Sequence, residues 1–115
     1  MNRVEILAEA SQIVSIDRNS AYGEPEDNFR VIAHLWYDYL AGRGLISSTE
    51  YLQPFDVAAM MILMKISRLV TSPEKQDHWV DIAGYAACGG GIFNEFQVQY
   101  DNSGYADEEI DAGPQ

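Results

Sequence analysis

The chain has 115 residues, one cysteine and a net charge of -11, from 18 acidic and seven basic residues. This length is enough to bury one core without disulfides or metals, whereas so acidic a chain lacks the clustered Lys and Arg that a nucleic-acid backbone requires. Lys65 interrupts the best apolar run before it reaches the roughly 18 residues that cross a bilayer. We therefore expect one cytoplasmic domain, with no membrane partner and no direct nucleic-acid binding.

Two helices are expected in the first 42 residues. Apolar side chains recur at helical spacing between Ile6 and Val14, which predicts a helix over residues 2–15. A loop rich in Asn, Ser, Gly and Pro follows, and Pro25 then opens a second helix because its fixed φ suits a first helical turn. Gly42 and Gly44 end that helix, and residues 41–53 are a linker.

The third expected helix, residues 54–70, is apolar almost all round yet carries Lys65 and Arg68 in its last third. A helix with this pattern belongs in a core. An unpaired buried cation costs several kcal/mol, so an anion is expected beside it. Either the chain's own carboxylates or the phosphate of a ligand would supply that anion.

A fourth helix is expected over residues 73–88, with Ser72 as its N-cap and the glycines at 89–91 as its end. Residues 92–100 fit either a short helix or an extended arm. No segment alternates at period two, so the fold class is all-α, a bundle of four to five helices over residues 1–98. Residues 99–115 hold five acidic residues and no Lys or Arg, which predicts an acidic, disordered tail.

One group of candidate site residues lies on the fourth helix. Asp77, Asp81 and Tyr85 recur every four residues and so share one face. Two antiparallel helices joined by a short turn would bring this face to Lys65 and Arg68. One interpretation is a structural salt-bridge network. The other is a pocket for a phosphorylated ligand, with Mg²⁺ held by the two aspartates and phosphate charge neutralised by the two cations.

A second group lies in and after the first loop. Arg18, Tyr22 and Asn28 offer a cation, an aromatic face and an amide, the groups that hold a phosphate, a stacked base and its polar edge. Arg30, one turn into the helix, would assist. The alternative is turn and capping chemistry, since Gly23 permits an unusual φ.

Three sequence blocks together resemble a protein family encoded widely in phages and prophages: YGEPEDNF, DVAAMMILMKISR and DHWVDIAGYAACGG, at residues 22–29, 56–68 and 77–90. More distantly, their order is similar to that in the MazG-like all-α nucleotide pyrophosphohydrolases. That resemblance implies a helical homo-oligomer that binds nucleoside triphosphates through Mg²⁺, in the cytoplasm of an infected or lysogenic bacterium. The positions that correspond are Tyr22 and Asn28 for the loop, Lys65 and Arg68 for the basic pair, and Asp77 and Asp81 for the acidic pair.

The chain also departs from the MazG-like pattern. The paired Glu-x-x-Glu and Glu-x-x-Asp motifs are missing, and Met64 stands where relatives often have a glutamate. Two or three Mg²⁺ ions would therefore lack ligands from one chain. The sequence favours a protein that binds a phosphorylated nucleotide and sequesters it without hydrolysis, as a counter-defence against host nucleotide signalling. The alternatives are a Mg²⁺-dependent NTP or dNTP pyrophosphohydrolase, and an acidic protein that mimics nucleic acid to inhibit a host protein.

Overall fold

The computed structural model describes residues 1–15 and 23–102, and within these ranges every regular element is helical. The four α-helices are α1 (Arg3–Ile13), α3 (Pro25–Gly42), α4 (Pro54–Leu69) and α5 (Gln76–Tyr100). The all-α expectation is confirmed for this part of the chain. Most of the loop before α3 and the acidic tail from residue 103 lie outside the described residues.

Local side-chain chemistry explains where the first helices begin. The Asn2 side chain accepts a hydrogen bond from the Glu5 backbone N–H at 2.9 Å, and the Glu5 carboxylate accepts one from the Asn2 N–H at 2.8 Å. This capping box satisfies two donors that the helix itself leaves free. Both α3 and α4 begin at a proline, and the Gln53 N–H donates to the Asp56 carboxylate at 2.8 Å at the start of α4.

The start of α5 differs from the prediction. Ser72 is not an N-cap, because α5 begins only at Gln76 and Lys75 occupies the capping position without a side-chain bond. Pro73 instead lies in the turn before the helix, where its carbonyl accepts the Trp79 indole N–H at 3.0 Å. This hydrogen bond joins residues six apart and gives the Pro73 carbonyl a partner outside a helix, which the sequence pattern does not show.

The end of α5 was also predicted wrongly, since the helix continues through Gly89–Gly91 for 25 residues in all. A glycine costs a helix about 1 kcal/mol but does not have to end it. At Gly89 the missing side chain has a packing role, because a Cβ atom there would lie only 2.9 Å from the Cβ of Ala58 on α4. Residues 92–100, for which a helix and an extended arm were both considered, belong to the same helix.

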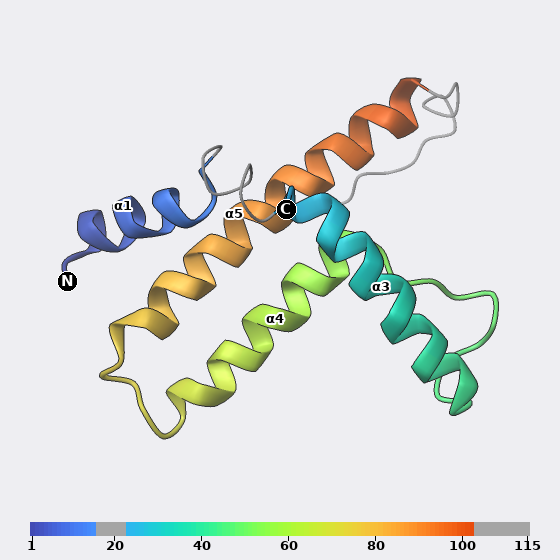
Figure 1. Ribbon diagram of the computed structural model, residues 1–115, viewed down its shortest axis with the longest axis horizontal. Helices are drawn as coiled ribbons and strands as arrows, with labels where there is room; N and C mark the ends of the chain where they lie inside the picture. The colour runs from blue at the N-terminus through green and yellow to red at the C-terminus, as the bar shows by residue number, and fades with distance from the viewer. Residues whose placement is uncertain (16–22, 103–115) are drawn as a thin grey trace, which may run out of the picture.

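The four helices are arranged around an antiparallel pair. Figure 1 shows α4 and α5 side by side, joined by the short turn before Gln76, with α1 packed against α5. α3 meets α4 near the N-terminal end of α4, and the two helices then diverge. The largest fully buried side chains of the described residues are Val57 of α4 and Val80 of α5.

One side of α4 is not covered. Leu63, Ile66 and Val70 keep 64%, 46% and 79% of their surface exposed, although the helix was expected to be buried all round. That expectation is wrong for a single chain because α5 covers one side of α4 while α3 diverges from it. None of the four helices in the described ranges is long and apolar enough to cross a membrane.

Candidate functional site

An open cavity of about 530 Å³ lies between the end of α1, the start of α3 and the first half of α5. It brings together four of the residues predicted from the sequence: Asn28, Asp77, Asp81 and Tyr85. These four residues come from the two separate groups of the predicted site, because Asn28 follows the first loop while the other three lie about 50 residues later. The remaining lining is mainly apolar and includes Ile13, Val14, Pro25 and Phe29.

The geometry of α5 explains how this cavity forms. Asp77, Asp81 and Tyr85 share one face of the helix, as their spacing predicted. The buried Gly84 lies beside that face, and a Cβ atom there would be 4.0 Å from Cγ1 of Val14 at the end of α1. The Tyr85 ring lies 6.2 Å from the ring of Phe29, centre to centre, at 34°. The cavity therefore has an aromatic wall and two carboxylates.

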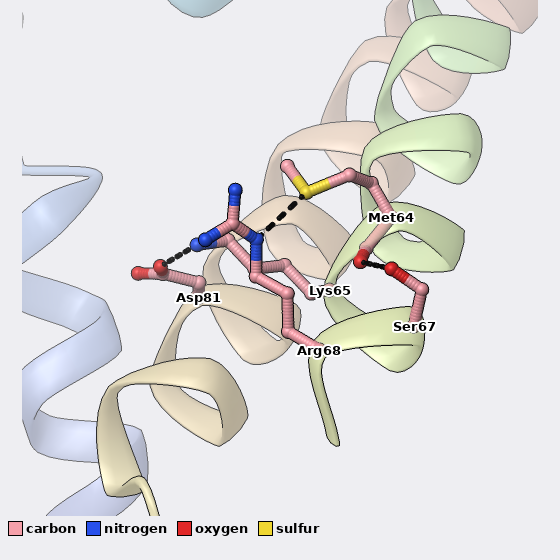
Figure 2. Close-up of polar contacts among 5 residues, drawn as sticks. All are labelled: Met64, Lys65, Ser67, Arg68 and Asp81. Atoms are coloured by element: carbon pink, nitrogen blue, oxygen red, sulfur yellow. Dashed lines mark hydrogen bonds and ion pairs between the residues drawn. The ribbon is translucent and has the colours of Figure 1, made fainter. Parts of the chain in front are cut away.

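Lys65 of α4 forms an ion pair with Asp81. Its Nζ atom lies 2.7 Å from Oδ2 of the carboxylate, and the two side chains are 16% and 32% exposed (Figure 2). The anion that Lys65 requires is thus supplied by the chain itself, as the salt-bridge interpretation predicted. Asp81 nevertheless lines the cavity, so its second carboxylate oxygen is the one left for a ligand.

Arg68 lies one turn further along α4, beside this ion pair (Figure 2). Its Nε donates to the sulfur of Met64 at 3.3 Å, and its guanidinium forms no ion pair with the described residues. A thioether is a weak acceptor, so Arg68 keeps most of its capacity to bind an anion. Met64 is uncharged, so this contact leaves the Arg68 cation without a carboxylate partner among the described residues.

Asp77 is the exposed carboxylate of the cavity. It lies in the first turn of α5, where a negative charge complements the helix dipole, and it has no hydrogen bond or ion pair to the described residues. Asp77 and Asp81 fit the coordination preference of Mg²⁺, which binds one or two carboxylates and completes its coordination shell with phosphate and water oxygens. No group of three or more His, Cys, Asp or Glu within residues 1–15 and 23–102 is placed to hold a metal.

The other predicted site residues are not brought to this cavity. Arg30 is exposed and pairs with Asp27 on its own helix at 3.0 Å. It lines a different cavity of about 400 Å³, together with His34 and Tyr37. Arg18 and Tyr22 lie outside the described residues, so the structure does not place them.

Cys88 lines the cavity and was not predicted as part of it. The sequence could have predicted this placement, since Cys88 lies three residues after Tyr85 on the same helix and so lies close to the same face. Burial raises the pKa of the Cys88 thiol above its ordinary value, and the Glu26 carboxylate raises it further. The thiol is therefore neutral at neutral pH, and the neutral thiol is a poor nucleophile.

We expect Cys88 to react slowly with iodoacetamide at pH 7–8. Because the raised pKa keeps the thiolate fraction low, the rate should be well below that of the same chain in denaturant. Raising the pH should increase the rate, with a midpoint above that of the denatured chain. Mass spectrometry of timed samples measures both rates, and equal rates in the two states would contradict the prediction.

The fold and this cavity define a small all-helical protein with a carboxylate-lined site. Over residues 5–93 the chain matches the family described as "Domain of unknown function (DUF6378)", and it belongs to that family. It is 39% identical over 90 residues to the "Gene 55 protein" of Mycobacterium phage D29, covering 78% of this chain and 54% of the relative. The "Gene 55 protein" of Mycobacterium phage L5 is 39% identical over 98 residues, covering 85% and 56%.

The chain thus spans about half the length of these phage relatives. No solved structure matches it. The expected resemblance to a phage-encoded protein family is confirmed by the family match and by these two phage relatives.

Proposed function

We propose that the protein binds a phosphorylated nucleotide, together with Mg²⁺, in the cavity between α1, α3 and α5, and holds it without hydrolysis. The observation that carries this proposal is the meeting of Asp77, Asp81 and the Phe29–Tyr85 wall in one cavity. Arg68 does not line the cavity, but it lies beside the ion pair that Asp81 forms with Lys65 (Figure 2). Its volume of about 530 Å³ suits a small molecule.

Electrostatics determines the form in which the nucleotide binds. Two carboxylates would repel a free phosphate, and Lys65 neutralises only one of them. Mg²⁺ between Asp77, Asp81 and the phosphates would remove that repulsion, and Arg68 would neutralise further phosphate charge. The aromatic wall offers a stacking surface for the base, and Asn28 an amide for its polar edge.

Two considerations favour binding over cleavage. The described residues offer a two-carboxylate site, whereas two-metal hydrolysis needs ligands for a second ion. The curated relatives are phage proteins, and a phage protein that holds a nucleotide would lower its free concentration in the host. Sequestration of a host signalling nucleotide, as a counter-defence, is the role we propose. The distant similarity to MazG-like proteins supports the same ligand class.

Calorimetry with a panel of nucleoside mono-, di- and triphosphates and cyclic nucleotides tests this proposal, with Mg²⁺ and with a chelator. We expect at least one nucleotide to bind with Mg²⁺ and to bind much more weakly in the chelator. Arg68→Ala should weaken that binding about tenfold to a hundredfold, because a hydrogen bond to a charged group contributes roughly 1.5–3 kcal/mol. Asp77→Asn should weaken it by a similar factor.

Arg43→Ala is the matched control, because Arg43 is also an exposed arginine but lies at the C-terminal end of α3, whereas Arg68 lies beside Asp81. It should leave the affinity unchanged. Absence of binding by every nucleotide, or equal effects of Arg68→Ala and Arg43→Ala, would overturn the proposal. Release of pyrophosphate by the wild-type protein would show that the hydrolase alternative is correct instead.

A further inference from the structure

One stripe on the exposed surface of α4 carries no charge. It consists of five exposed residues of α4 and the residue that follows the helix, all uncharged: Ala59, Met60, Leu63, Ile66, Ser67 and Val70. Arg68, the other exposed residue of α4, lies on a different face of the helix. A helix that faces water on one side normally places charged residues there. The composition of this stripe is that of a buried surface, although the single chain leaves it uncovered.

α3 has a second uncovered apolar stripe. Val31, Leu35 and Tyr39 are spaced by four residues and so share a face, and each is 60% or 61% exposed. The neighbouring face of α3, with Phe29, Ala33 and Trp36, is the one turned inward. Only part of this helix's apolar surface is therefore used inside the chain.

A groove joins the two stripes. It has a volume of about 250 Å³ and is lined by Trp36, Tyr39 and Leu40 of α3 and by Met60 of α4. Figure 1 shows the two helices diverging from the region where they meet. The combined surface, which we call the α3/α4 face, thus offers a hollow as well as projecting side chains such as Leu63 and Val70.

We propose that the α3/α4 face is the interface with a second copy of this chain, as a two-fold homodimer. Its seven exposed large side chains leave apolar area on the order of several hundred Å² in water. A stable interface buries about 800 Å² from each partner, so this face supplies a large part of what a dimer needs. Large exposed apolar patches on soluble proteins are often interaction sites.

Two features favour a second copy over a different protein. A two-fold interface requires one surface to be complementary to itself, and the α3/α4 face has both a groove and the side chains to fill it. The net charge of -11 opposes the association of two copies, and a surface without charge adds least to this repulsion. The stripe on α4 meets this condition over more than two helical turns.

Sedimentation equilibrium of the full chain at micromolar concentration tests the proposal. We expect a mass of about twice 12.9 kDa for the wild-type protein. Leu63→Glu should raise the dimer dissociation constant at least about thirtyfold, because it places a charge at the centre of the interface in each copy. Leu7→Glu on α1 is the matched control, since Leu7 and Leu63 are both 64% exposed.

Val70→Lys provides a second variant that leaves the fold of one chain intact, because Val70 is 79% exposed. It should also weaken the dimer, and circular dichroism should show unchanged helix content. A monomeric wild-type protein would overturn the proposal. So would a dimer that Leu63→Glu or Val70→Lys weakens no more than Leu7→Glu does.

Discussion

Gly89→Ala is expected to lower the free energy of unfolding, although alanine is the better helix former. The new Cβ atom would lie 2.9 Å from the Cβ of Ala58, well inside the normal contact distance. Both atoms are attached directly to the backbone, so α4 and α5 would have to move apart. Overpacking of this kind costs about 1–3 kcal/mol, which exceeds the roughly 0.5–1 kcal/mol that alanine contributes in a helix.

Gly90→Ala is the matched control, because nothing lies within 4 Å of a Cβ atom at this position. It should raise the free energy of unfolding by about 0.5–1 kcal/mol, through the lower entropy of the unfolded chain. Urea unfolding followed by circular dichroism measures both variants. Stabilisation by Gly89→Ala equal to that by Gly90→Ala would show that α4 and α5 do not approach as closely as described.

Lys65→Met should destabilise the protein by about 1–2 kcal/mol. The substitution leaves the Asp81 carboxylate without its cation in a partly buried position. Breaking a fully buried pair costs about 3–5 kcal/mol, and the smaller figure follows because Asp81 is 32% exposed and water screens its charge. A double-mutant cycle with Asp81→Asn isolates the coupling between the two side chains.

The exposed pair between Arg30 and Asp27 is the internal comparison. These side chains are 57% and 66% exposed, so Arg30→Met should change the free energy of unfolding by less than about 0.5 kcal/mol. A coupling energy for Lys65 and Asp81 no larger than that of Arg30 and Asp27 would contradict the structural role assigned to Lys65. Nucleotide affinity measured on the same variants separates this role from ligand binding.

The sequence alone was sufficient where neighbouring residues set the outcome. Asn2 with Glu5, and the prolines at 25 and 54, determine where three helices begin, because these effects act within one helical turn. The four-residue spacing of Asp77, Asp81 and Tyr85 likewise placed them on one face. Together with the short turn before α5, it predicted the pairing of Lys65 with Asp81.

Tertiary structure decided what depends on contacts between distant residues. Gly89 is a helix breaker by local propensity, yet it lies within α5. Its role is in packing, because the close approach of Ala58 leaves no space for a side chain at this position. The placement of Asn28 beside Asp77, and of Arg30 away from it, depends on how α3 crosses the bundle, which no local pattern specifies. The all-round apolar pattern of α4 predicted burial on every side, whereas the structure shows one side that its own chain leaves uncovered. A helical apolar pattern predicts that a surface is buried, whereas the three-dimensional arrangement of the helices decides what covers that surface.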